Sequence, residues 1–161
     1  MWYQPTANFV SGKLVSCYKA SCDIYNDGMW TELVKTRVSR IMHSTVQTEN
    51  QILLIGGFQT HSTEWIPVDG SPSQPGPFEV RNREWHCTIQ VSLHTLVVTG
   101  GRVHETAAEN YVTEYQLTGD GAERVLNGMI TGRYLHACGH YRDADGQQVR
   151  TVHRGFALIQ S

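Results

Sequence analysis

Short apolar segments recur along the chain, each bounded by residues that favour turns. Residues 52–55 (Ile-Leu-Leu-Ile) and 96–99 (Leu-Val-Val-Thr) are too short for an independent helix and rich in branched side chains. Each follows a segment in which polar and apolar residues alternate, residues 43–47 in the first case and 86–91 in the second. A short turn separates the two segments of each pair, so the pattern predicts two β-hairpins.

Two further strand-like segments follow each hairpin. A Thr-Glu-aromatic sequence, at residues 63–65 and again at 113–115, opens a segment that runs into a turn. The fourth segment is residues 77–80 in the first copy and 122–126 in the second. Four short strands in a unit of about 45–50 residues predict an antiparallel sheet. Because no long amphipathic segment predicts a helix, the expected fold class is all-β.

A second pattern shows that the units are repeats. The sequence Arg-x-x-His occurs at residues 40–43, 83–86 and 133–136. Beyond the apolar run, the first two copies are followed by Gly-Gly, at positions 56 and 100 for the first glycine, 44 positions apart. A repeat of this length is typical of chains built from similar stacked sheets. The residues expected to have this repeated structural role are His43, His86, His136, Gly56, Gly57, Gly100, Gly101, Glu64 and Glu114.

In these features the chain resembles kelch repeats, from about Cys22 to Tyr141. Such repeats open with a basic residue and a histidine, continue through an apolar strand to Gly-Gly, and then have a strand with an acidic and an aromatic residue. The resemblance implies an incomplete kelch-type β-propeller made of antiparallel four-stranded blades. The expected divisions are a blade remnant over residues 1–33, blades over 40–80 and 83–127, and a degraded or incomplete blade over 133–161.

The last unit departs from the repeat. Where an apolar strand should stand, residues 148–156 contain Arg150, His153 and Arg154, and only residues 155–156 (Gly-Phe) match the earlier pattern. Propellers close from about 4–8 blades, and closure removes exposed sheet edges. About three blades cannot close a ring. We therefore predict an open arc whose exposed edges allow self-association.

Composition and charge exclude some classes of partner. The 161 residues suffice for one domain with a core, and 40% hydrophobic against 17% charged residues is a globular composition. The formal net charge of −2 gives no general attraction to nucleic acid or to an anionic membrane. No segment approaches the about 20 apolar residues of a membrane span, and the N-terminus lacks the pattern of a secretory signal. The expected compartment stays open: the cytoplasm, or an extracellular location if the chain is a fragment.

The four cysteines leave their oxidation state open. Cys17 and Cys22 bracket a short loop, and they either close a disulfide or remain half-buried thiols. Cys87 and Cys138 each follow a repeated histidine, one step apart in register. Buried free thiols are one interpretation of these two, and their state stays open.

The arginines are the main candidates for binding. In kelch propellers the residues before the first strand of a unit lie near one mouth of the central channel, and several members use arginines there to hold acidic peptide segments. The resemblance thus implies an arginine-lined face for a partner rich in Glu or Asp, because a guanidinium pairs with a carboxylate through two hydrogen bonds. In the alternative, each arginine braces its own turn or pairs with Glu64, Glu84 or Glu114. The candidate partner-binding residues are Arg40, Arg83, Arg133, Arg81 and Arg102, with Arg37 nearby.

The histidines raise the question of a metal site. His136, Cys138 and His140 are residue types that zinc prefers, but alternate residues of one strand are too nearly collinear for a tetrahedral site. One histidine per unit instead favours a repeated structural hydrogen bond. Residues 143–146 (Asp-Ala-Asp-Gly) are similar to the start of a calcium loop without its later ligands, so we predict a turn there. No metal and no cofactor are expected.

Together, these patterns predict a non-enzymatic protein-interaction scaffold. No nucleophile is marked by a neighbouring base. The loops over residues 59–62, 70–77 and 102–110 differ in length between units, and loops on a rigid scaffold are where binding specificity usually resides. One alternative is a truncated product without independent function. The other is a fragment of a galactose-oxidase-like copper oxidase propeller, with candidate ligands Tyr134, His136, Cys138 and Tyr141.

Overall fold

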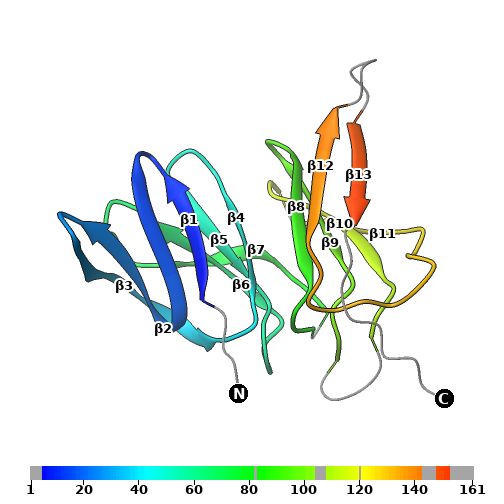
Figure 1. Cartoon of the computed structure of the whole chain (residues 1–161), viewed down its shortest axis with the longest axis horizontal. Helices are drawn as coiled ribbons and strands as arrows, with labels where there is room; N and C mark the ends of the chain where they lie inside the picture. The colour runs from blue at the N-terminus through cyan, green and yellow to red at the C-terminus, as the bar shows by residue number, and fades with distance from the viewer. Residues whose placement is uncertain (1–4, 82, 104–107, 120, 143–147, 153–161) are drawn as a thin grey trace. The chain divides into compact units, whose positions relative to one another are not determined.

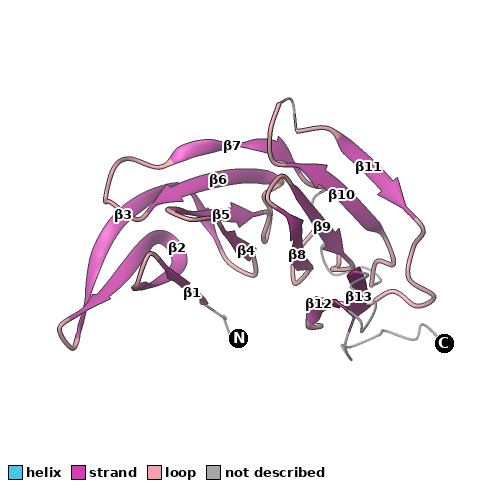
Figure 2. Cartoon of the chain, turned by 90° about the horizontal axis from the view of Figure 1, so that it is seen from above, coloured by secondary structure: helices cyan, strands magenta, loops and turns pink. Residues whose placement is uncertain are grey.

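The computed structural model describes residues 5–81, 83–103, 108–119, 121–142 and 148–152. Within these residues the chain forms strands and loops without any helix (Figures 1 and 2), which confirms the all-β class. The described residues accordingly include no helix long and apolar enough to cross a membrane. The chain divides into two compact units, Met1–Asn82 and Arg83–Ser161, and each is described in its own right.

The first sheet of the N-terminal unit has the order β1-β2-β3, with β1 at Thr6–Val10, β2 at Lys13–Asn26 and β3 at Met29–Arg40. Strand β2 doubles back on itself. Five extended residues span about 17 Å, yet the Cα atoms of Cys17 and Cys22 lie 4.0 Å apart. The first arm of β2 pairs with β1 and the second arm pairs with β3, each in antiparallel register, so β2 contributes two arms to this three-stranded sheet.

The turn between β2 and β3 is a tight hairpin. Asp27 and Gly28 have φ angles of 48° and 84°, and two consecutive positive φ angles give the turn a twist that matches the strands. Tyr25 and Trp30 lie opposite each other beside this turn, with their ring centroids 5.3 Å apart.

The second sheet of this unit has the order β4-β5-β6-β7. Its strands are antiparallel and occupy Ser44–Gln47, Gln51–Ile55, Ser62–Pro67 and Gln74–Glu79. The apolar run at 52–55 is buried throughout its length in β5, one of the two interior strands of the sheet. This is the strand arrangement that the alternation and the apolar run predict for residues 43–80.

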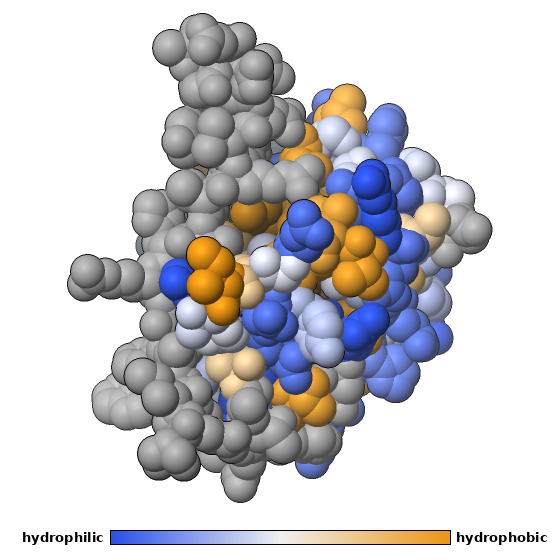
Figure 3. Space-filling view, turned by 90° about the vertical axis from the view of Figure 1, so that its right-hand side faces the viewer, coloured by the Kyte–Doolittle hydropathy of each residue, from blue (hydrophilic) through white to orange (hydrophobic). Residues whose placement is uncertain are grey.

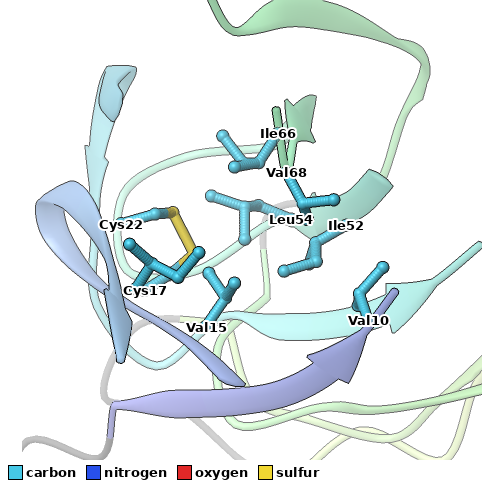
Figure 4. Packing of buried hydrophobic residues seen from close by; sticks show 9 residues of the cluster. Val10, Val15, Cys17, Cys22, Ile52, Leu54, Ile66 and Val68 are labelled. Carbon is cyan, nitrogen blue, oxygen red and sulfur yellow. A yellow bond between two sulfur atoms is a disulfide. The ribbon is translucent and has the colours of Figure 1, made fainter. Parts of the chain in front are cut away.

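The core of the N-terminal unit lies between its two sheets (Figure 4). One sheet contributes Val10, Val15, Cys17, Cys22 and Ile24, and the other contributes Ile52, Leu54 and Ile66, together with Val68 directly after β6. Burial of each Val, Leu or Ile side chain stabilises the folded chain by about 1.5–3 kcal/mol relative to exposure. The Cys17–Cys22 disulfide lies inside this cluster. Of the two states left open for this cysteine pair, the structure has the disulfide.

The C-terminal unit contains a four-stranded antiparallel sheet of order β11-β10-β9-β8 and a two-stranded sheet β12-β13. Their bounds are Cys87–Ser92 (β8), Thr95–Thr99 (β9), Val112–Gln116 (β10), Glu123–Leu126 (β11), Cys138–Arg142 (β12) and Gln148–Val152 (β13). Ile89, Val91 and Val97 form a small core. A second disulfide joins Cys87 on β8 to Cys138 on β12, so the state left open for this pair is a disulfide and not two free thiols. On the face shown in Figure 3, the coloured residues mix apolar and polar side chains.

The first sheet extends beyond the blade remnant that was expected over residues 1–33. It begins at Thr6 and continues to Arg40. At the other end, the described residues include only β12 and β13 of the expected unit over 133–161. The turn predicted at 143–146 and the Gly-Phe match at 155–156 lie outside the described residues.

Candidate functional site

All three Arg-x-x-His copies share one backbone feature. The residue before each histidine has a positive φ angle: 60° at Met42, 53° at Trp85 and 52° at Leu135. Bulky side chains rarely adopt this left-handed region, and each instance costs about 1–3 kcal/mol that the surrounding structure must offset. Because the outlier occurs at the same position in every copy, the motif specifies a particular turn as well as two side chains.

The glycine pairs fit against this turn. Gly56 and Gly57 have φ angles of 56° and 121°, and a Cβ atom on Gly57 would lie 2.7 Å from the carbonyl oxygen of Ile41. In the second copy, a Cβ atom on Gly101 would lie 2.9 Å from the carbonyl oxygen of Glu84. Glycine is therefore needed both for the positive φ angle and for the close approach of two backbone segments.

A backbone hydrogen bond fixes the residue that follows each glycine pair. Phe58 N–H donates to the carbonyl of Ile41 at 2.9 Å, and Arg102 N–H donates to the carbonyl of Glu84 at 3.0 Å. The two units thus have the same backbone geometry at this end of the sheet. They present different side chains on it: Ile41 and Phe58 in one, Glu84 and Arg102 in the other.

Arg40 is buried within this geometry. Its Nη1 donates to the carbonyl oxygens of Gly56 (3.1 Å) and Ser62 (2.6 Å), and its Nη2 lies 3.3 Å from Glu64 Oε2. Only 1% of each side chain of the Arg40–Glu64 pair is exposed. Burial lowers the pKa of the Arg40 guanidinium, whereas the charge of Glu64 and its hydrogen bond oppose that shift. A buried, paired guanidinium cannot reach a partner, so the bracing interpretation holds at Arg40.

The other candidate arginines differ in exposure. Arg83 is as buried as Arg40, and its Nη1 donates to the carbonyl of Gly100 at 3.3 Å, so it too leaves the candidate binding set. Arg133 is half-buried and Arg81 is exposed. Of the repeated acidic residues, Glu64 is fully buried and Glu114, on β10, is half-buried.

The repeated histidines make structural hydrogen bonds. His43 Nε2 lies 3.1 Å from Thr6 Oγ1, and His136 Nε2 lies 2.8 Å from Thr99 Oγ1. Burial, and secondarily the charge of Arg40, lowers the pKa of His43 to about 4. Burial and then the charge of Arg133 also lower the pKa of His136. Each ring is therefore neutral near pH 7, with Nε2 bonded to a hydroxyl and Nδ1 buried without a hydrogen-bond partner among the described residues.

His86 also contacts its own turn. Its Nδ1 lies 3.2 Å from the carbonyl oxygen of Arg83, inside the same Arg-x-x-His copy. The histidine of the second copy thus helps to hold the turn that precedes it. This contact, like those of His43 and His136, favours the structural interpretation of the repeated histidines.

The disulfides bear on the metal hypotheses. Cys138 is bonded to Cys87, and a disulfide sulfur is neither a zinc thiolate nor a thioether precursor. The side chains of His140 and Tyr141 lie outside the described part of the chain. In that described part, no three His, Cys, Asp or Glu side chains lie close enough to hold a metal ion. Neither the zinc set nor the copper set is assembled by the side chains that the structure describes.

In each unit we call the loop end the end of the four-stranded sheet where the Arg-x-x-His turn meets the loop after Gly-Gly. In the C-terminal unit, the loop end has a cluster of aromatic and charged side chains. Arg102 Nε lies 2.6 Å from Glu84 Oε1, and its guanidinium lies 4.2 Å from the centroid of the Trp85 ring. The rings of Trp85 and Tyr134 stack with centroids 5.7 Å apart. Leu135 N–H donates to the Trp85 carbonyl at 3.1 Å and thereby ties two of the turns together. Arg102 is thus held by its own unit while remaining partly exposed.

In the N-terminal unit, the loop end forms a cavity of about 400 Å³. Its walls come from three places: the bend of β2, the end of β3 with the following turn, and the loop after Gly57. The lining residues are Lys19, Val38, Ser39, Ile41, Phe58, Gln59 and Thr60. The sequence predicts a binding loop at 59–62, and the fold adds Lys19 and Val38 to it. No local pattern links positions 19 and 58, because the fold alone makes them neighbours.

Comparison with known proteins identifies a similar fold. No protein-family model matches the chain, and no curated protein matches it. Among solved structures, the chain is similar to one described as the structure of YjhT, with a TM-score of 0.73 and 11% sequence identity. The match covers 87% of this chain and 56% of that chain, so this chain spans little more than half the length of that protein. At this identity the similarity shows the fold alone.

Proposed function

We propose that the chain is a non-enzymatic protein-interaction scaffold, built as a segment of a kelch-type β-propeller. In this proposal each antiparallel sheet of four strands or arms is one blade, and the segment is an open arc. The shared turn at all three Arg-x-x-His copies supports a repeat architecture. The similarity in fold to the solved structure over 87% of the chain is consistent with it.

One observation supports this function more than any other. At the loop end, the two units keep the same backbone hydrogen bond, from Phe58 to Ile41 and from Arg102 to Glu84, while the side chains change. Constant backbone geometry with variable side chains is what a scaffold that presents binding loops requires. Each unit would then present a contact surface of its own: the cavity in the N-terminal unit and the Arg102 cluster in the C-terminal unit. Arg81 and Arg133 would contribute charge, and the buried Arg40 and Arg83 would not.

Selection of binding peptides tests this proposal. A library of random dodecapeptides is displayed on phage and selected against the full chain, and dissociation constants of the selected peptides are measured by fluorescence polarisation. Phe58→Ser and Arg81→Gln alter the loop end, and Met29→Ser is a matched exposed control beside the β2–β3 turn. We expect at least one loop-end variant to weaken binding about tenfold or more, with the control unchanged.

Two results would contradict the proposal. One is a selection that enriches no peptide, or peptides that bind all variants equally. The other is a stoichiometric amount of copper in the purified chain, since this would favour the oxidase alternative.

A further inference from the structure

The first sheet of the N-terminal unit has an outer face, which is turned away from the core of that unit. Side chains alternate between the two faces of a strand. On the second arm of β2, Cys22 and Ile24 lie in the core, so Tyr25 lies on the outer face. Trp30 is opposite Tyr25 in register and lies on the same face. With Tyr25 43% and Trp30 49% exposed, the described part of the unit leaves this aromatic pair open to solvent.

Charged side chains continue along the outer face of β3. Glu32 follows Trp30 by two residues and therefore lies on the same face. Residues 33–34 (Leu-Val) then both pack against the core, and the register between β2 and β3 shifts at this point. A bulge of this kind re-aims the side chains that follow it. Lys35 and Arg37 thus lie on the outer face, and both are exposed.

The outer face of β3 consequently has one aromatic, one negative and two positive side chains in order: Trp30, Glu32, Lys35 and Arg37. None of the three charged side chains forms an ion pair within the part of the chain that the structure describes. Positions 32 and 35, like positions 30 and 37, are centred on the link between residues 33 and 34. An antiparallel second copy therefore brings Glu32 opposite Lys35 and Trp30 opposite Arg37. Twofold symmetry forms each contact twice.

The C-terminal unit already contains the arginine contact that this arrangement requires. The Arg102 guanidinium lies 4.2 Å from the centroid of the Trp85 ring, while its Nε lies 2.6 Å from a carboxylate oxygen. One arginine can thus contact a ring face and a carboxylate together. On β3 the ring and the carboxylate are Trp30 and Glu32, and the guanidinium would come from Arg37 of the second copy.

The backbone edge of β3 is not available for the same contact. The Ser73 hydroxyl donates to the carbonyl oxygen of Lys35 at 3.2 Å, and the backbone N–H of Arg37 donates to Glu64 Oε1 at 2.5 Å. These bonds tie the edge to the second sheet at the residues that a partner strand would need. Addition of a strand at this edge therefore conflicts with the fold, whereas packing of side chains on the outer face does not.

We propose that the outer face of the first sheet is an interface between two copies of this chain. The two sheets pack face to face about 10 Å apart, with the two β3 strands antiparallel and the twofold axis between the faces. Glu32 pairs with Lys35 of the second copy, and Trp30 stacks against its Arg37. The argument for this occupant is the charge complementarity of the face with itself. The inference goes beyond the proposed function and does not depend on the loop end.

A charge-swap experiment on the full chain tests the pairing. Sedimentation equilibrium measures the dimer dissociation constant of the parent chain, of Glu32→Lys and of Lys35→Glu. Each variant alone has like charges at both symmetry-related pairs, so we expect it to dimerise at least about tenfold more weakly than the parent chain. An equimolar mixture of the two variants has opposite charges at both pairs again and should associate about as tightly as the parent chain. Added salt should weaken association of the parent chain, because the pairs are near solvent.

Matched variants locate the interface. Trp30→Leu removes the ring face and should weaken dimerisation about threefold. Met29→Ser changes the neighbouring residue, which is 65% exposed on the opposite face of β3, and should leave dimerisation unchanged. Glu79→Lys makes the same charge change as Glu32→Lys on an exposed residue of β7 and should alter dimerisation less than about twofold. Dispersion of the amide NMR spectrum confirms that each variant is folded.

Three results would overturn the inference. The parent chain could remain monomeric as its concentration is raised, or the mixture could associate no more tightly than either variant alone. In the third, the β3 variants dimerise like the parent chain, which would place association on another surface. A monomeric chain that still binds peptides at the loop end removes this inference and leaves the proposed function. Rescue by the mixture in a chain that binds no peptide would do the reverse.

Discussion

Arg40 and Glu64 form a buried ion pair, with Nη2 and Oε2 separated by 3.3 Å and both side chains 1% exposed. Glu64 Oε1 also accepts a hydrogen bond from the backbone N–H of Arg37 at 2.5 Å. The pair links the end of β3 to β6 and thus connects the two sheets of the N-terminal unit. In the sequence, the arginine of the first Arg-x-x-His motif is a candidate for partner binding. In the structure, this arginine cross-links two sheets.

Removal of one member of this pair should be strongly destabilising. Glu64→Gln leaves the Arg40 charge buried without its counterion, and we expect a loss of about 3–5 kcal/mol in the free energy of unfolding. Urea denaturation monitored by fluorescence measures it. The matched control is Glu79→Gln, which breaks an exposed contact to His61 and should cost less than about 1 kcal/mol. Similar losses for the two variants would contradict the structural role of the pair.

The glycine pairs provide a second comparison. Gly57→Ala introduces a Cβ atom 2.7 Å from the carbonyl oxygen of Ile41 and retains an unfavourable φ angle of 121°. Gly28→Ala also has a positive φ angle, 84°, but its Cβ atom would meet nothing within 4 Å. We expect about 1–2 kcal/mol of destabilisation for Gly28→Ala from backbone strain alone. Gly57→Ala should cost about 1–3 kcal/mol more from the steric conflict. Equal midpoints in thermal unfolding would show that the close approach is unimportant.

Much of the fold is predictable from the sequence because its signals are local. The apolar run at 52–55 and the alternation around it specify hairpin partners that are neighbours in the chain, and β4 to β7 follow directly. Strand β1 and the first arm of β2 were missed because they lack both Arg-x-x-His and Gly-Gly. The signal that was available is alternation: Val10, Val15 and Cys17 are buried, while their neighbours are more exposed.

The site is less predictable because it depends on burial and on tertiary contacts. An arginine in a repeated motif is equally compatible with a surface and with an internal brace, and only packing places Arg40 inside. The positive φ angles at Met42, Trp85 and Leu135 have no sequence signal, since bulky residues usually avoid this conformation. The disulfide between Cys87 and Cys138 spans 51 positions, a distance at which spacing alone does not specify a pairing.

His43 should make stability depend on pH. Burial lowers its pKa from 6.5 to about 4 in the folded chain, so between these values the unfolded chain binds the proton more strongly. The contribution of neutral His43 is fully present above pH 6.5 and decreases as the pH falls toward 4. Between pH 7.5 and pH 5 we expect a loss of about 2 kcal/mol from this residue.

Measurement of that contribution needs a variant without the titrating group. Urea denaturation at pH 5 and pH 7.5 is compared for the parent chain and for His43→Gln, whose amide does not titrate. The parent chain should lose more stability than the variant over this interval. His136, whose pKa is also lowered by burial, titrates in both proteins and therefore cancels in the comparison. A pH dependence that is the same in both proteins would be incompatible with a buried neutral His43.

The two disulfides should contribute unequally to stability. A cross-link restricts the unfolded chain more when it closes a longer loop, and the sequence separations here are 51 for Cys87–Cys138 and 5 for Cys17–Cys22. The chain-entropy relation gives about 4 kcal/mol for the long loop and about 2 kcal/mol for the short one. We therefore expect the double variant Cys87→Ser/Cys138→Ser to unfold at a lower urea concentration than Cys17→Ser/Cys22→Ser.

Thiol titration in denaturant, with and without prior reduction, counts the cysteines that are paired in each protein. Reactive thiols in the unreduced parent chain would show that a disulfide is absent. A larger loss from the Cys17–Cys22 variant would instead mean that packing within the core of the N-terminal unit outweighs loop entropy.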